Sequence, residues 1–322
     1  MPTHDPSQRG PHPVGVIETR IPSPDDPLDR DRVLPTAIWY PARPGVRERD
    51  DAAHPLGLPH RATTDLSPLL DGPLPLVVFS HGNSGLRQQS TFLMTHLASH
   101  GFVVAAPDHV GNTFDEMMAL ETDDERREVH LRARAQRPVD VGRVITALVD
   151  EGTESSRRPA IDPARIGVLG HSFGGWTALK IPARESRVRS VCCLAPASEP
   201  FVGRRAFDEG ELPLSPEVAA LVLAATDDVL VDRGQSIDPL FVRLGDHARL
   251  EWMDDADHYH FCDGAELLHK VHENTPRPNL PRSPRPIESL RREGDAHAWL
   301  SERVTDFFLT SLATRVAGEV AA

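Results

Sequence analysis

The segment 166–180, IGVLGHSFGGWTALK, constrains the fold of this chain more than any other part of it. An apolar run leads into a Gly-x-Ser-x-Gly motif centred on Ser172, and an amphipathic stretch follows. This order is typical of a tight strand-to-helix turn that lifts a serine hydroxyl out of a sheet, with glycines that permit the close backbone approach. The alternative is a glycine-rich turn that merely packs a helix on a strand. The strand and helix on its two sides favour a nucleophilic Ser172.

Short apolar runs alternate with longer amphipathic stretches along most of the chain. Runs such as LVVFS and FVVAAP are apolar at consecutive positions, as in strands covered on both faces. The alternation predicts an α/β protein with a mostly parallel sheet. The expected parallel strands are Leu74–Ser80, Phe102–Pro107, Arg165–Gly170, Val188–Ala195, Val218–Ala225 and Ala248–Met253, with antiparallel edge strands at Val14–Thr19 and Thr36–Tyr40. The expected helices are Ser90–His100, Val139–Glu151, Gly174–Ile181, Ala265–Glu273 and Ala296–Arg315.

Composition excludes several classes of function. The 322 residues are 39% hydrophobic, enough for a sizeable core, and their net charge of −13 disfavours binding to nucleic acid or to an anionic membrane surface. The sequence has no run of 18 apolar residues and no visible signal peptide, so we expect no transmembrane segment and a cytoplasmic location. The three cysteines lack metal-binding spacing, and no nucleotide-binding fingerprint occurs, so we expect neither a metal nor a cofactor.

A second motif, Ser-His-Gly-Asn at positions 80–83, follows the apolar run LPLVVF. In sheets that carry a Gly-x-Ser-x-Gly turn, a loop after an early strand supplies one oxyanion donor, and the residue after the serine supplies the other. This assigns the backbone N–H groups of Asn83 and Phe173, which are typically worth about 3 to 4 kcal/mol of barrier each. Taken alone, His-Gly would indicate a plain turn. Its place before the serine motif favours oxyanion binding.

A nucleophilic serine needs a base and an acid that orients the base, in the chain order serine, acid, histidine. One expected strand downstream of the serine ends in Asp227 and Asp228, and the next leads into DDADHYHF with His258 and His260. Loops at the carboxyl ends of parallel strands face the serine, so all four residues are candidates. His171 is a poor base candidate because the sharp turn should project it away from the serine.

With these motifs the chain resembles the α/β-hydrolases of the platelet-activating-factor acetylhydrolase (isoform II) and dienelactone-hydrolase-like group, and the related cutinase-like polyester hydrolases. The resemblance runs from Leu74 to Phe261. It is carried by LVVFSHGNSGLRQQSTFLMTHLASHGFVVAAPDH, IDPARIGVLGHSFGGWTAL and DHYHFCD. The family places a phenylalanine three residues after its catalytic histidine, which implies His258 rather than His260. It also implies Asn83 as the oxyanion donor after His-Gly.

The chain departs from the mammalian acetylhydrolases at one point. Those enzymes carry their acid at the end of the strand after the nucleophile helix, where this chain has SVCCLAPASEP with Ala195 and Pro196. The acid is therefore expected on the following strand, as in the cutinase-like group, whose pattern implies Asp228 rather than Asp227. Glu199 is the alternative if neither aspartate serves. The departure weakens the expectation of a phospholipid substrate more than the expectation of serine-hydrolase chemistry.

We therefore expect one α/β-hydrolase domain over residues 1–322, with a cap insertion at 113–136 and a Pro/Arg-rich surface segment at 274–286. The expected function is hydrolysis of small carboxylic esters through an acyl-enzyme, with Ser172 as nucleophile, His258 as base and Asp228 as orienting acid. An acyltransferase, amidase or peptidase with the same triad is the alternative. A non-catalytic ligand-binding protein on this fold is disfavoured because every triad position is filled. No sequence feature predicts the oligomeric state.

Overall fold

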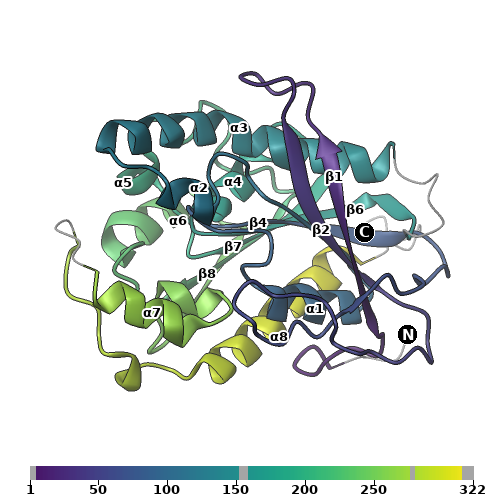
Figure 1. Cartoon of the computed structure of the whole chain (residues 1–322). Coiled ribbons are helices and arrows are strands. Elements are labelled where there is room, and N and C mark those ends of the chain that lie inside the picture. Colours follow the sequence, from purple (N-terminus) through teal and green to yellow (C-terminus); the bar gives the residue numbers. More distant parts are fainter. Residues whose placement is uncertain (1–4, 152–158, 276–279, 314–322) are drawn as a thin grey trace, which may run out of the picture.

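A twisted sheet forms the centre of the molecule, and helices cover both of its faces (Figure 1). The structure is a computed structural model that describes residues 5–151, 159–275 and 280–313. Within these residues the sheet has nine strands in the order β3-β1-β2-β5-β4-β6-β7-β8-β9. The pairs β1–β2 and β2–β5 are antiparallel, whereas β5, β4 and β6 to β9 pair in parallel. The predicted α/β architecture with a mostly parallel sheet is confirmed.

Most strands follow the expected apolar runs. The exceptions are β3, which was not expected, β6, which begins at Ile161 rather than Arg165, and β2, which lies inside the sheet rather than at its edge. They are β1 (Val14–Pro22), β2 (Val33–Pro41), β3 (Thr63–Thr64), β4 (Leu74–Ser80), β5 (Val103–Pro107), β6 (Ile161–His171), β7 (Val188–Leu194), β8 (Ala219–Ala225) and β9 (Ala248–Met253). The central strands are buried along nearly their whole length, as their consecutive apolar residues require.

The helices lie in two layers and at the carboxyl edge of the sheet. They are α1 (Thr91–Ser99), α2 (Phe114–Met118), α3 (Asp123–Val149), α4 (Phe173–Lys180), α5 (Glu199–Val202), α6 (Asp238–Leu244), α7 (Ala265–Glu273) and α8 (Glu293–Ser311). Short helical turns occur at Arg233–Ile237, His258–Phe261 and Ile287–Ser289. In Figure 1, α3 and α4 cover one face of the sheet, and α1 and α8 cover the other. No helix of the described residues is long and apolar enough to cross a bilayer.

Each layer of helices buries its own hydrophobic core against the sheet. Successive side chains of a strand point to opposite faces, so Val78 packs in the core under α3 and α4, while Phe79 packs in the core with α1 and α8. Trp176 of α4 and Phe308 of α8 are among the largest fully buried side chains of these two cores. Because a hydrophobic core packs on each face, the sheet forms a rigid support for the loops at the carboxyl ends of its strands.

Helix α3 differs most from the expectation, because it begins at Asp123 rather than at Val139. Thr122 caps its N-terminus and accepts a hydrogen bond from the Glu125 N–H at 3.2 Å, while the Glu125 carboxylate accepts from the Thr122 N–H at 2.8 Å. The predicted helix covers only the part of α3 after Pro138. Proline lacks an N–H, but the helix runs through it without ending. The segment 113–136, expected to form a cap, consists of α2 and the first half of α3.

Two other expectations fall partly outside the described residues. The helix predicted for Ala296–Arg315 is α8, which starts three residues earlier and ends at Ser311. Its expected last residues, 314 and 315, are not described. Residues 276–279 of the Pro/Arg-rich segment 274–286 are likewise not described.

Candidate active site

Ser172 lies between β6 and α4 in a backbone conformation that residues other than glycine rarely adopt. Its φ is +55° and its ψ is −117°, and it forms the N-cap of α4. The Ser172 N–H donates to the Leu194 carbonyl at 2.8 Å, and the Ser172 carbonyl accepts from the Ala197 N–H at 2.9 Å. Positive φ at a non-glycine residue costs energy, and this backbone is held by strand β7 beside it. The strained turn between strand and helix is the geometry that the Gly-x-Ser-x-Gly motif predicts.

The glycines around Ser172 are required by close backbone approaches. A β-carbon added at Gly170 would lie 2.0 Å from the Gly174 carbonyl oxygen, and one at Gly174 would lie 1.9 Å from the Ser80 carbonyl oxygen. Both obstacles are backbone atoms, so no side-chain rotation would relieve them. The second contact also shows that the end of β4 packs directly against the start of α4.

The loop after β4 runs beside Ser172. A β-carbon added at Gly82 would lie 3.5 Å from the Cβ of Ser172. Asn83 follows in this loop, and its N–H makes no hydrogen bond to another described residue. Phe173 is the first residue of α4, where backbone N–H groups have no partner within the helix. The structure therefore brings both predicted oxyanion donors to the neighbourhood of the serine.

Asp228 and His258 meet at the carboxyl edge of the sheet, after β8 and β9. Their side chains share a hydrogen bond of 2.7 Å between His258 Nδ1 and Asp228 Oδ2. The other oxygen of Asp228 accepts the N–H groups of Leu230 and Val231, both at 2.8 Å. Asp228 is 3% exposed and His258 is 7% exposed. A carboxylate held by two backbone donors is fixed in orientation, and it favours the imidazole tautomer with the proton on Nδ1.

The other candidate residues lie elsewhere. Asp227 accepts from Arg285 Nη1 at 2.9 Å and does not contact His258. His260 is fully buried and contacts the Asp257 carboxylate at 2.6 Å through Nδ1. Glu199 is the first residue of α5, where it pairs with Arg243.

Residues 77–320 match the model of the Alpha/beta hydrolase family. The chain belongs to this family. It is 33% identical to the platelet-activating factor acetylhydrolase of Canis lupus familiaris over 158 residues, which are 38% of this chain and 35% of the relative. It is 27% identical to Cutinase 1 of Thermobifida cellulosilytica over 120 residues, which are 37% of this chain and 38% of the cutinase. The predicted resemblance to both groups is confirmed, although the matches span only about a third of each relative.

A solved structure shares the fold over nearly the whole of this hydrolase. The ferulic acid esterase from Streptomyces cinnamoneus superposes with a TM-score of 0.64 at 22% identity, covering 97% of this chain and 93% of the esterase. Identity at this level shows a common fold. The relatives and the fold together identify an α/β-hydrolase with esterase-type homologues.

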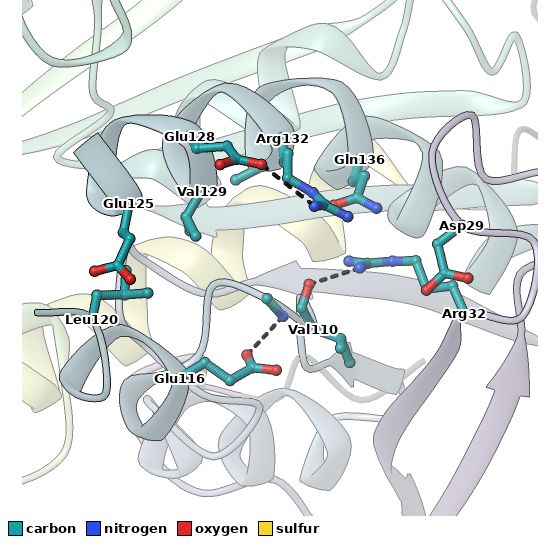
Figure 2. Close-up of a pocket in the computed structure, with 12 residues that line it drawn as sticks. Asp29, Arg32, Val110, Glu116, Leu120, Glu125, Glu128, Val129, Arg132 and Gln136 are labelled. Carbon is teal, nitrogen blue, oxygen red and sulfur yellow. Dashed lines mark hydrogen bonds and ion pairs between the residues drawn. The ribbon is translucent and has the colours of Figure 1, made fainter. Parts of the chain in front are cut away.

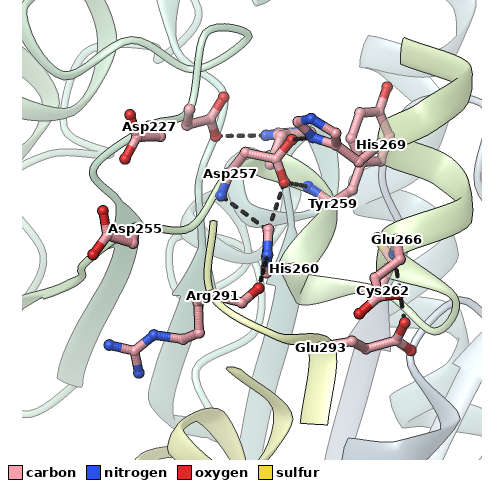
Figure 3. A network of polar contacts seen from close by, with 12 residues as sticks. Asp227, Asp255, Asp257, Tyr259, His260, Cys262, Glu266, His269, Arg291 and Glu293 are labelled. Carbon is pink, nitrogen blue, oxygen red and sulfur yellow. Dashed lines mark hydrogen bonds and ion pairs between the residues drawn. The ribbon is translucent and has the colours of Figure 1, made fainter. Parts of the chain in front are cut away.

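A buried histidine network supports the loop that carries His258 in this hydrolase (Figure 3). The Asp257 carboxylate contacts Nδ1 of His260 and Nδ1 of His269, and it accepts the Tyr259 N–H at 3.0 Å. Burial of Asp257 opposes its ionisation, but the hydrogen bonds from the two histidines outweigh it and hold its pKa far below the usual range. Burial likewise lowers the pKa of His269, but Asp257 raises it more, so the net shift is upward. Sequence analysis missed His269 because it lies on α7, outside any motif.

Gln89 and His171 link the loop after β4 to the loop that carries His258. The Gly82 N–H donates to Gln89 Oε1 at 2.8 Å, and Gln89 Nε2 donates to His171 Nδ1 at 2.9 Å. Nε2 of His171 then donates to the His258 carbonyl oxygen at 3.1 Å. Burial holds the pKa of His171 well below its usual value, so the ring is neutral, as this relay requires. His171 therefore links the loop after β4 to the loop that carries His258, and both of its ring nitrogens are hydrogen-bonded.

A cavity of about 330 Å³ lies between α2, α3 and the β1–β2 connection (Figure 2). Arg32 crosses it to donate to the Val110 carbonyl at 2.7 Å, and the Glu116 carboxylate accepts the Gly111 N–H at 2.7 Å. Its lining contains neither Ser172 nor His258. The polar groups of this cavity connect the loop after β5 to α2 and to the β1–β2 connection.

Among the described residues, no group of three or more His, Cys, Asp or Glu side chains is arranged to hold a metal ion.

Proposed function

We propose that this α/β-hydrolase is a serine esterase that cleaves carboxylic esters through an acyl-enzyme. Ser172 is the nucleophile, His258 the general base and Asp228 the acid that orients it. The observation that most supports this assignment is the 2.7 Å hydrogen bond between His258 and Asp228 at the same sheet edge as the strained serine. Esterase-type homologues point to the same reaction class.

The proposed reaction begins when the Ser172 hydroxyl attacks the ester carbonyl. His258 accepts the hydroxyl proton on Nε2, because Asp228 holds the other proton of the ring on Nδ1. The tetrahedral intermediate collapses, and His258 returns the proton to the departing alcohol. A water molecule then attacks the acyl-enzyme with His258 again as base, which releases the acid and restores Ser172.

The oxyanion of each tetrahedral intermediate is proposed to bind the N–H groups of Asn83 and Phe173. Both belong to backbone segments that cannot shift easily, since Gly82 packs against Ser172 and Phe173 opens α4. Donors that are already aimed at the developing charge need no reorganisation during the reaction. The N-terminal end of α4 adds a favourable dipole for the negative charge.

The surroundings of the site support a substrate with an apolar group next to the ester. The Phe114 N–H donates to the Gly85 carbonyl at 3.1 Å, so α2 adjoins the loop after β4 that carries Asn83, here called the oxyanion loop. The Phe114 and Met118 side chains of α2 are exposed. On the other side, Phe201 packs edge-on against Phe173 with ring centroids 5.3 Å apart and is also exposed. Large apolar side chains exposed near the loop after β4 and near Phe173 suit an acyl or alkoxy group of similar character.

A panel of p-nitrophenyl esters of increasing acyl length, run beside p-nitroanilides of the same acids, tests this proposal. We expect turnover of the esters, slow or absent cleavage of the anilides, and no turnover by Ser172→Ala. Faster cleavage of anilides would identify an amidase, and product formed only with an added amine or alcohol would identify an acyltransferase. Absence of turnover together with no labelling by a fluorophosphonate would identify a ligand-binding protein.

A further inference from the structure

A second Ser–His–Asp constellation lies buried beneath the oxyanion loop. Ser80 Oγ and His109 Nε2 are 2.8 Å apart, and His109 Nδ1 and Asp140 Oδ2 are also 2.8 Å apart. All three residues have no exposed surface, and Arg32 binds both oxygens of Asp140 at 3.0 and 2.9 Å. Burial holds the pKa of His109 well below its usual value. No substrate can reach this serine, so the constellation supports the end of β4, from which the oxyanion loop starts.

Arg137 of α3 is the central donor of this buried region. Its side chain is fully buried, and it donates to the carbonyl oxygens of His81 at 2.6 Å and Gly82 at 2.8 Å. It also donates to Asn112 Oδ1 at 2.7 Å, and its guanidinium lies 4.6 Å from the centre of the Phe173 ring. Burial lowers the pKa of Arg137 to about 9, so the group still carries its charge at pH 7. Burial of a charge against neutral acceptors is costly, and a core of apolar side chains would serve the fold better.

The two carbonyl bonds determine the direction of the backbone N–H groups in the oxyanion loop. In a trans peptide the C=O and the N–H point in opposite directions. The Gly82 carbonyl shares its peptide with the Asn83 N–H. Its partners are Arg137, His81 Nδ1 at 2.7 Å and the Gly85 N–H at 3.2 Å. The Asn83 N–H is therefore turned away from Arg137. The His81 carbonyl likewise shares its peptide with the Gly82 N–H, which donates to Gln89.

We propose that Arg137 is a positioning residue that fixes the Gly82–Asn83 peptide so that the Asn83 N–H is aimed at the oxyanion. This inference rests on the proposed esterase function. Arg137 acts from behind the loop and touches no reacting atom. Asn112 extends the same arrangement, since it accepts from Arg137 and its Nδ2 donates to the Asn83 side chain at 3.0 Å. Arg137 thus binds the carbonyl of the peptide that carries the Asn83 N–H and, through Asn112, reaches the Asn83 side chain.

The test compares Arg137→Lys with wild type by kcat, KM and thermal melting on one p-nitrophenyl ester. Lysine keeps the charge but is a point donor that cannot hold the two carbonyls and Asn112 together. Loss of one oxyanion donor lowers kcat by about 10²- to 10³-fold. We therefore expect kcat of Arg137→Lys to fall by about 100-fold, because the Asn83 N–H would no longer be aimed at the oxyanion. We expect KM within about threefold of wild type, because the ground-state ester uses the hole little. Binding of a trifluoromethyl ketone, which places an oxyanion in the hole, should weaken in proportion to kcat/KM.

Leu148→Ala is the matched control, since Leu148 is a buried core residue on the same helix and has no part in the site. We expect it to lower the melting temperature and to leave kcat and inhibitor affinity within about threefold of wild type. Asn112→Ala is the second test variant, because it removes a partner of Arg137 and spares the buried charge. It should lower kcat and inhibitor affinity together, by about tenfold.

Two results would overturn the inference. In the first, wild type shows Ser172-dependent hydrolysis and the kcat of Arg137→Lys lies within threefold of the wild-type value. The second is a loss of kcat that follows melting temperature alone, as in Leu148→Ala, with inhibitor affinity unchanged. If Arg137→Lys does not fold, Asn112→Ala decides by the same two criteria. If wild type shows no Ser172-dependent hydrolysis, the proposed function fails, and that result is distinct from these two.

Discussion

Asp228→Asn replaces one carboxylate oxygen by an NH₂ group. The hydrogen bonds around Asp228 determine which way the new amide faces and therefore which tautomer His258 adopts. Oδ1 of Asp228 accepts the N–H groups of Leu230 and Val231. An asparagine at this position must keep its oxygen on these two donors, so its NH₂ faces Nδ1 of His258. That nitrogen must then accept, which moves the imidazole proton to Nε2. The base would carry a proton on the atom that has to receive one from Ser172.

The expected magnitude follows from the wrong tautomer. In serine hydrolases with this arrangement, the same swap lowers kcat by about 10⁴-fold, or about 5 kcal/mol of barrier. We expect Asp228→Asn to lose at least about 10³-fold in kcat on a p-nitrophenyl ester at neutral pH. The melting temperature should change little, because the bonds to Leu230 and Val231 survive. Both quantities are measured on the same purified sample.

Asp227→Asn is the matched control, since it makes the same chemical change one residue away. Asp227 pairs with Arg285 at a partly exposed position, and such pairs contribute about 0 to 1 kcal/mol to stability. We expect its kcat within about threefold of wild type. A stronger loss in Asp227→Asn than in Asp228→Asn, or a tenth of wild-type activity left in Asp228→Asn, would refute the assignment of the acid.

Three further predictions concern the base, the serine turn and the buried histidine network. His258→Ala should lower kcat at least about 10³-fold, whereas His260→Ala should mainly lower the melting temperature, and the reverse ranking would transfer the base role. Gly174→Ala should lower both stability and activity, because the added β-carbon would clash with backbone atoms of the β4 end. Gly142→Ala on α3 should be neutral or slightly stabilising, because beyond its own helix no atom lies within 4 Å of the added β-carbon. Equal melting temperatures of the two variants would contradict the packing argument. The pKa of His269 is lowered by burial but raised more by its carboxylate partner, so its stabilising effect is full below pH ~6.5 and falls as pH rises through the higher folded-state pKa. Unfolding free energies should therefore differ more between wild type and His269→Gln at pH 6 than at pH 9, and a constant difference would contradict the assigned charge.

The parts of the fold that could be predicted are those with local signals. Consecutive apolar residues predicted the central strands, and the glycine pattern predicted the turn at Ser172, because both depend on nearby residues. The start of α3 was missed, although Thr122 and Glu125 carry a capping-box signal that marks it. The strained backbone at Ser172, by contrast, is predicted by the motif itself.

The parts of the site that could not be predicted depend on contacts between distant segments. Adjacent Asp227 and Asp228 look alike in sequence, and the bonds that separate them come from Arg285 and from the backbone after Asp228. His269 and Arg137 lie on helices without any motif, and their partners are backbone carbonyls or side chains from other segments. A sequence pattern carries no information on which carbonyl a buried cation will meet. Such residues become visible only when the chain is folded.

Intact-protein mass spectrometry after reaction with a fluorophosphonate tests the central claim most directly. The reagent phosphonylates a serine only when a base activates it and an oxyanion hole stabilises the addition. The account predicts one adduct per chain, located by peptide mapping on Ser172 and absent from Ser172→Ala. The buried Ser80, which has the same residue types beside it, should remain unmodified. No adduct on the folded wild-type protein, or an adduct that persists in Ser172→Ala, would contradict the account.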